Sequence, residues 1–256
     1  MLEQRVSEIA SAPLATKRCA KADITTGPDP RLLPVWLGFA AGFVDTLGFV
    51  ALFSFFTAHV TGNFVVVGSE LSQPMHGVIA KLLALPMFMI SVAAARLYGR
   101  SLDRRERSTA APLLILEAIF LIVFMALGLF AAPITDADAP IAILTAMTGV
   151  VAMGIQNAAS RTVFASYSPT TVMTGNVTQL VIDAVDLMGG GPEATLHPVR
   201  ARFMRFWPPV LAFAVGAACG GFGYKVGGFL SLLVPIALVF ALAIHARVKA
   251  IHESHS

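Results

Sequence analysis

Long apolar stretches separated by short polar ones fill the chain from residue 32 to residue 246. About 20 apolar residues in a helix cross the hydrocarbon core of a bilayer. Six stretches reach this length, and they cover Leu32 to Phe53, Val78 to Tyr98, Pro112 to Ala132, Pro140 to Ala165, Trp207 to Tyr224 and Gly228 to Ala246. The pattern predicts an all-α integral membrane protein with about six transmembrane helices.

Two further apolar stretches, Thr57 to Leu71 and Thr170 to Leu187, are shorter or more polar, and both carry the same tripeptide. Thr61-Gly62-Asn63 recurs 113 positions later as Thr174-Gly175-Asn176. Glycine lets a helix begin or break, and the two polar residues can bond the backbone groups that are freed there. The tripeptides therefore predict two re-entrant or broken segments.

The similarity between the two regions extends beyond the tripeptide. Glu70 matches Asp183 at the same offset, and Asp45 matches Asn157 at an offset of 112 positions. A recurrence at a nearly constant offset is typical of internal repeats. We expect a single membrane domain at 32–246, built from one repeat at 32–132 and a second at 140–246.

The distribution of charge predicts the orientation of the repeats, because Arg and Lys mark cytoplasmic loops. Basic residues follow the second span at Arg100 to Arg107 and precede the fifth at Arg200 to Arg205. The charged residues of Pro133 to Ala139, in contrast, are all acidic. If both Thr-Gly-Asn segments enter and return, every basic loop lies inside and the repeats are inverted. The rival topology has eight crossings and parallel halves, and it places Arg100 to Arg107 outside.

Composition supports a membrane protein, since 56% of the residues are hydrophobic, only 13% are charged and the mean hydropathy is +0.76. A soluble domain carries about 25% charged residues. Residues 1–31 lack the apolar core of a signal peptide, so we expect a disordered cytoplasmic tail there and a second cytoplasmic tail at 247–256. The expected location is the inner membrane.

The two halves also resemble a known family. Gly42 to Asp45, His59 to Asn63, Gly154 to Ala158 and Thr174 to Gln179 follow a paired pattern that resembles the YoaK-like family of uncharacterised bacterial inner-membrane proteins. The resemblance covers most of residues 32–246. It implies a polytopic membrane protein and carries no substrate or mechanism with it.

Asp45 is the foremost candidate for function, because an acid in the middle of a span costs several kcal/mol. It could carry a proton or bind a cation, or it could hold neighbouring helices together. Its counterpart Asn157 and the adjacent Gln156 would line the opposite wall of one cavity. His59 could relay protons or lie at the mouth of the segment, and Val172 takes its place in the second half.

The Thr-Gly-Asn residues themselves have two interpretations. Thr61, Gly62 and Asn63, with Thr174, Gly175 and Asn176, could form central binding elements, since paired interruptions mark the site in inverted-repeat transporters. They could instead serve helix packing alone. Glu70 and Asp183 are secondary candidates, and we favour an interfacial anchoring role for both. We expect Glu117, which stands five residues into the third span, to lie near the interface.

Small-residue motifs at Gly38/Gly42, Gly216/Gly220 and Gly223/Gly227 predict close helix packing and allow, without requiring, a homo-oligomer. Signatures of common hydrolases, metalloproteases and nucleotide-binding proteins are absent, and Cys19 and Cys219 have no metal or redox spacing. We expect no enzymatic activity, no cofactor, no metal and no nucleic-acid partner. An intramembrane enzyme using Asp45 and His59 would lack a nucleophile.

The sequence thus favours transport of a small polar solute or ion, coupled to a proton or cation gradient through Asp45. The bilayer and the solute are the expected partners. The alternative is a membrane scaffold or sensor whose repeats serve packing and whose basic surface contacts a partner or anionic lipid.

Overall fold

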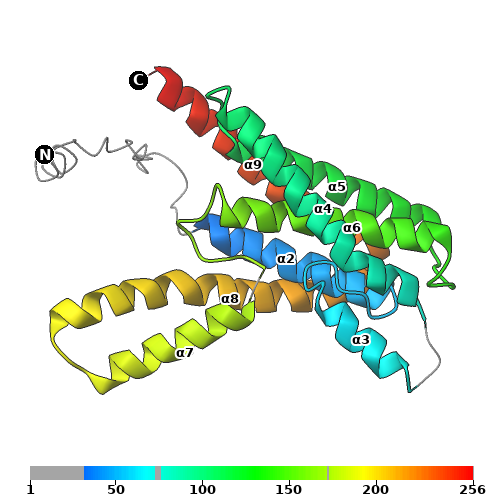
Figure 1. Ribbon diagram of the computed structural model, residues 1–256, viewed down its shortest axis with the longest axis horizontal. Helices are drawn as coiled ribbons and strands as arrows, with labels where there is room; N and C mark the ends of the chain where they lie inside the picture. Colours follow the sequence, from blue (N-terminus) through cyan, green and yellow to red (C-terminus); the bar gives the residue numbers. More distant parts are fainter. Residues whose placement is uncertain (1–31, 73–75, 172, 256) are drawn as a thin grey trace, which may run out of the picture.

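The computed structural model describes residues 32–72, 76–171 and 173–255, and these residues form helices and no strand (Figure 1). The expected tail at residues 1–31 lies outside the described residues. The elements are α2 (Leu32–Ala51), α3 (Gly62–Glu70), α4 (Val78–Asp103), α5 (Ala110–Ala131), α6 (Pro140–Arg161), α7 (Met173–Gly189), α8 (Glu193–Gly227), the 3-10 helix η1 (Gly228–Leu232) and α9 (Leu233–His255).

Five helical stretches within the described residues are long and apolar enough to cross a membrane. Four are α2, α4, α5 and α6, and the fifth runs for 60 residues from Glu193 to His252 through α8, η1 and α9. The nine residues of α3 extend only about 13 Å at 1.5 Å per residue, less than half of a bilayer core of about 30 Å. The all-α membrane class is confirmed, whereas the count of six crossings stays a prediction.

Two helices are longer than the sequence pattern indicated. Arg200, Arg202 and Arg205, which we placed in a loop, lie within α8, so the loop assignment was wrong. This helix begins 14 residues before the predicted start at Trp207, and its first half packs against α7. The expected C-terminal tail likewise continues α9 as far as His255. Hydropathy misses these extensions because good helix formers such as Ala, Arg and Lys are polar or only weakly apolar.

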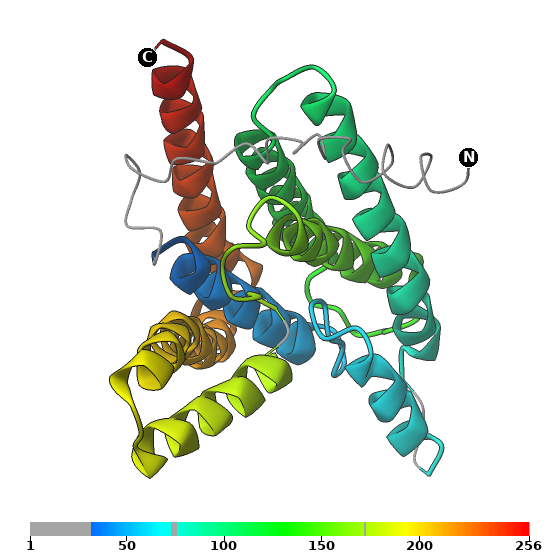
Figure 2. The ribbon, with the colours of Figure 1, turned by 60° about the vertical axis from the view of Figure 1, so that its left-hand side comes forward.

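The helices of the two halves pack in a reciprocal pattern. The first long helix of each half packs on the second long helix of the other, as α2 on α8 and α6 on α4. Each short helix packs on the helix that follows it, as α3 on α4 and α7 on α8. Figure 2 shows α3 and α7 leaving the bundle in different directions. Two internal repeats that pack on each other's helices would produce this arrangement.

Glycine allows α2 and α8 to approach each other at backbone distance. A Cβ atom added at Gly42 would lie 2.2 Å from the Phe213 carbonyl oxygen, and one added at Gly216 would lie 2.1 Å from the Phe39 carbonyl oxygen. Real Cβ contacts are never this short. The faces that carry Gly42 and Gly216 are therefore packed against each other within one chain, and a homo-oligomer stays a prediction.

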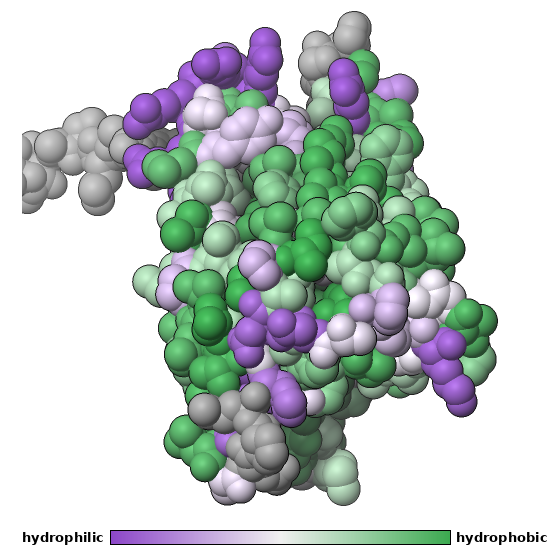
Figure 3. All heavy atoms as spheres, turned by 90° about the vertical axis from the view of Figure 1, so that its right-hand side faces the viewer, coloured by the Kyte–Doolittle hydropathy of each residue, from purple (hydrophilic) through white to green (hydrophobic). Residues whose placement is uncertain are grey.

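The connections between helices lie at two opposite ends of the bundle. The α3–α4 and α5–α6 connections lie together, since the Gly77 N–H donates to Asp138 Oδ2 at 3.3 Å. In Figure 1 the start of α2, the α4–α5 connection and the end of α9 lie toward the opposite end. Apolar residues cover much of the face shown in Figure 3, and large exposed side chains such as Met89, Leu97 and Phe130 are placed to contact lipid.

Candidate functional site

The chain reverses direction at the end of α2 and returns along the helix that it has just left. Phe53 and Ser54 both adopt positive φ angles, of 54° and 61°, and the Ser54 N–H donates to the Phe49 carbonyl at 3.0 Å. A six-to-one bond of this kind after a left-handed residue is the usual C-terminal stop of a helix. The stop directs the following loop back toward the middle of α2.

Asp45 receives this loop. Its Oδ1 accepts hydrogen bonds from the backbone N–H groups of Thr57 at 2.8 Å, Ala58 at 2.7 Å and His59 at 3.4 Å, and from the Thr57 hydroxyl at 3.2 Å. The residue is only 4% exposed. Asp45 therefore fixes the loop that leads into α3.

His59 joins the same cluster through its side chain. Its Nδ1 lies 2.6 Å from Asp45 Oδ2, which places the hydrogen on Nδ1 when Asp45 is ionised. The ring also meets Phe213 of α8 edge-on, with the centroids 5.5 Å apart. The side chain is 35% exposed, against 6% for that of Asp45. His59 thus connects a buried acid with the surface and with the other half of the protein.

Asn63 closes the loop at its far end. Its Oδ1 accepts from the Phe56 N–H at 2.8 Å, and its Nδ2 donates to the Phe56 carbonyl at 2.9 Å. Thr61 is the residue before α3 and makes no side-chain capping bond. The side chain of Asn63, fully buried, is therefore committed to holding the backbone that precedes α3.

The second half repeats this construction with neutral groups. Asn157 Nδ2 donates to the Thr171 hydroxyl at 2.6 Å, and Asn176 Nδ2 donates to the Pro169 carbonyl at 2.6 Å. Gln156 is fully buried and donates to the Leu37 carbonyl of α2 at 2.9 Å and to Thr170 Oγ1 at 3.0 Å. Each half therefore folds a loop back along its first long helix before its short helix begins.

The two clusters are separate from each other. Asp45 bonds to residues 57–59, Gln156 and Asn157 bond to Leu37, Thr170 and Thr171, and no hydrogen bond joins the two groups within the described residues. The opposing walls of one cavity that we expected from Asp45 and Asn157 stay a prediction. At the helix starts, Thr61, Thr174 and Gly175 are exposed and Gly62 is half-buried against the Phe56 ring.

The secondary candidates pin the far ends of the short helices. Glu70 on α3 forms an ion pair with Lys81 of α4, which is 1% exposed and also donates to the His76 carbonyl at 2.7 Å. Asp183 on α7, which is fully buried, accepts from Arg202 Nε of α8 at 2.9 Å. The matched acids thus anchor their helices to equivalent neighbours, and their interfacial position stays a prediction.

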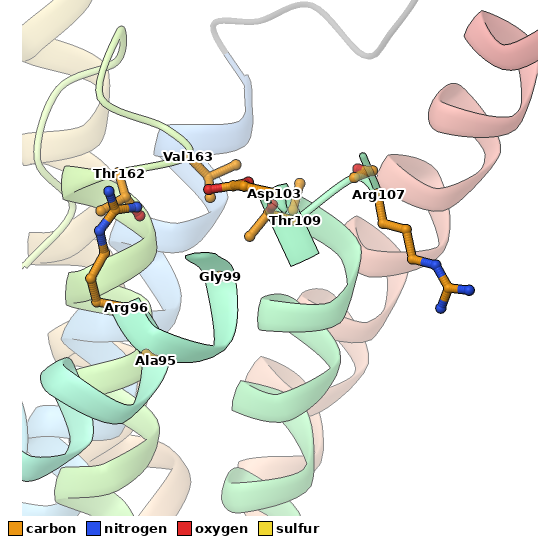
Figure 4. Close-up of a pocket in the computed structure, with 10 residues that line it drawn as sticks. Ala95, Arg96, Gly99, Asp103, Arg107, Thr109, Thr162 and Val163 are labelled. Atoms are coloured by element: carbon orange, nitrogen blue, oxygen red, sulfur yellow. Dashed lines mark hydrogen bonds between the residues drawn. The ribbon is translucent and has the colours of Figure 1, made fainter. Parts of the chain in front are cut away.

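Two cavities lie apart from the Asp45 cluster. One, of about 510 Å³, is formed by the end of α4, the start of α5 and residues after α6, and Figure 4 shows Arg96 directed toward Thr162 and Arg107 pointing away. The other, of about 560 Å³, is an open apolar groove along α7 that includes Thr174. No group of three or more His, Cys, Asp or Glu that could hold a metal occurs in the described ranges.

Known proteins match most of the chain. Residues 33–245 match the family described as "Protein of unknown function (DUF1275)". The chain belongs to this family. A relative from Bacillus subtilis (strain 168), UPF0700 transmembrane protein YoaK, is 28% identical over 215 residues, which cover 83% of this chain and 92% of the relative. The YoaK-like resemblance is confirmed, and the chain is a multi-pass membrane protein. No solved structure matches the chain.

Sequence reasoning missed several residues of the site in this DUF1275 protein. Thr57 and Thr170 stand at the same offset of 113 positions as the tripeptides, so the repeat itself held the signal for them. Lys81 and Arg202 have no such match and were not foreseen as partners. Glu117 is fully buried in α5 among the other helices, which the sequence did not indicate, and its expected place near the interface stays a prediction.

Proposed function

We propose that this DUF1275 protein is a membrane transport protein that moves a small polar solute or ion, with Asp45 and His59 coupling the movement to a proton or cation gradient. The proposal is transport and not catalysis. Asp45, buried in the first span and bonded to a partly exposed histidine, is the observation that carries it. An ionisable residue within a span is a functional candidate because its burial is costly.

The coupling follows from what Asp45 holds. A proton or a cation on the carboxylate would weaken the bonds to the N–H groups of residues 57–59, and those bonds position the start of α3. A change of charge at His59 would be felt at Phe213, and so at α8 of the other half. One binding event can therefore bias both halves, as alternating access requires.

We further propose six crossings, with α3 and α7 as half-helices that enter from opposite faces, and two repeats of inverted topology. The reciprocal packing of the halves and the short length of α3 support this arrangement. We place the protein in the inner membrane with both termini in the cytoplasm, since the basic α4–α5 connection lies toward the same end as the start of α2 (Figure 1).

Within this arrangement the Thr-Gly-Asn residues take different roles. Asn63 and Asn176 hold the loops, since their side chains bond backbone carbonyls. Thr61, Gly62, Thr174 and Gly175 would supply the polar groups that meet the solute at the starts of the two half-helices, where N–H groups favour an anion or a carbonyl oxygen.

The alternative is a membrane scaffold or sensor, and one observation favours it. The hydrogen bonds of Asp45 and Asn63 are all made within their own half of the chain, as a purely structural role would require. In that case the basic residues Arg104 and Arg105 would matter more than Asp45, through contact with a partner or anionic lipid.

Asp45→Asn separates the two functions. The amide keeps an oxygen for the backbone N–H groups and presents NH₂ to His59 Nδ1, so the loop is retained while the charge is removed. We expect transport currents to fall to the level of empty liposomes. The measurement is solid-supported-membrane electrophysiology of proteoliposomes challenged with alkali cations, ammonium, inorganic anions, an amino-acid mixture and a monosaccharide mixture.

The matched control is the double variant Arg104→Gln/Arg105→Gln, which should keep its currents. Wild-type currents in Asp45→Asn would rule out Asp45 as the coupling site. A phenotype confined to the arginine variant would favour the scaffold.

A further inference from the structure

Glu117 is a buried acid that the Asp45 cluster does not use. It is fully buried in α5, and neither carboxyl oxygen has a hydrogen-bond partner among the described residues. It lies on a stripe of the helix with Leu114, Leu121 and Phe124, and none of these three is exposed. Asp45 in the first span, by contrast, is bonded through both oxygens.

Within the described residues, no side chain of the elements packed against α5 forms a hydrogen bond with Glu117. These elements are α6, α9 and η1. The last has no titratable residue, α6 has only its final residue Arg161, and α9 has His245, Arg247, Lys249, His252, Glu253 and His255. An unpaired carboxylate in apolar surroundings is far more costly than a neutral carboxyl, so the group neutralises itself by holding a proton.

A possible acceptor lies across the α5–α6 contact. A Cβ atom at Gly149 would lie 3.4 Å from the Phe124 ring, which sets the register of these consecutive antiparallel helices. Glu117 stands seven residues before Phe124, and Gln156 stands seven residues after Gly149. Seven residues are about two helical turns, so both side chains return to the same face at the same level. Gln156 Oε1 is itself buried and without a partner.

We propose that Glu117 is a second proton-binding site, which holds a proton in this conformation and releases it when the core opens to water. In the release step the carboxyl O–H bond breaks, the proton passes to a water molecule and the carboxylate keeps the electron pair. Gln156 Nε2 itself donates to Thr170 Oγ1, at the loop that precedes α7. Only the release step rests on the proposed transport function.

The proton itself can be detected without a transported solute. In protein reconstituted into nanodiscs at pH 7, infrared spectroscopy should show a C=O band of a protonated carboxylic acid that shifts when glutamate carries ¹³C. The band should vanish in Glu117→Gln and persist in Asp45→Asn, because the labelled band belongs to a glutamate. Glu117→Leu replaces the glutamine variant if the latter does not fold. Absence of a glutamate band in the wild type, or its survival in either Glu117 variant, overturns the proposal.

The release step has its own readout. In proteoliposomes that give transport currents, Glu117→Gln should remove the dependence of the current on the pH gradient while the protein stays folded. A current that keeps the wild-type dependence overturns the proposal. If the wild type gives no current with any solute, the transport function fails, and the infrared band alone then decides whether Glu117 binds a proton.

Discussion

Asp45→Ala will lower the free energy of unfolding by about 4 kcal/mol, since each buried donor left without a partner costs about 1–3 kcal/mol. The substitution removes the acceptor of the Thr57 and Ala58 N–H groups, which donate at 2.8 and 2.7 Å, together with the partner of His59. The loop before α3 then has nothing to close on. Thermal unfolding of the purified protein in detergent measures the loss.

Two variants bracket this result. Asn157→Ala, at the matched position of the second half, removes one hydrogen bond to Thr171 and should cost about 1 kcal/mol. Asp45→Asn should stay close to the wild type because it preserves the acceptor. If Asp45→Ala is no less stable than Asn157→Ala, then Asp45 does not anchor the loop, and its burial needs another explanation.

Gly220→Ala will disrupt the contact between α2 and α8 in the same experiment, whereas Gly221→Ala will not. A Cβ atom at Gly220 would lie 2.2 Å from the Phe43 carbonyl oxygen, a backbone atom that moves only if the helix moves. Overpacking of this kind costs about 3 kcal/mol or more. At Gly221 the nearest atom is Thr46 Cγ2 at 3.5 Å, an ordinary contact, and alanine gains up to about 1 kcal/mol in helix propensity.

The two glycines are neighbours on one helix, so they control for each other. A clear fall in melting temperature and in the monodisperse fraction is expected for Gly220→Ala alone. Equal stability of the two variants would mean that α2 and α8 are not packed at backbone distance.

The long helices could be predicted from the sequence because apolar length is the dominant signal in a membrane protein. Their ends could not. The segment from Glu193 to Arg205 is polar yet continues α8, since α7 packs along it. The hydropathy of a segment does not include the stabilisation that a neighbouring helix provides.

The residues of the site could be predicted where they recur between the two halves, and not elsewhere. Asp45, Asn63 and Asn176 stood out because they recur, or replace a residue, at a fixed offset. What they bond to was not predictable, since a loop that folds back on its own helix leaves no periodic trace. The burial of Glu117 was not predictable either, because burial depends on packing by α6 and α9 and not on distance from the end of a span.

The orientation of the two half-helices is the central claim, and cysteine labelling tests it most directly. Single cysteines would replace Ser72, Thr135, Ser101 and Ala194, all exposed, in a protein whose Cys19 and Cys219 are changed to serine. The label is a membrane-impermeant maleimide applied to intact cells. We predict labelling at Ser72 and Thr135, and at Ser101 and Ala194 only after permeabilisation. Labelling of Ser101 from outside, with Ser72 and Thr135 protected, would show that α3 crosses fully and would contradict the inverted repeats.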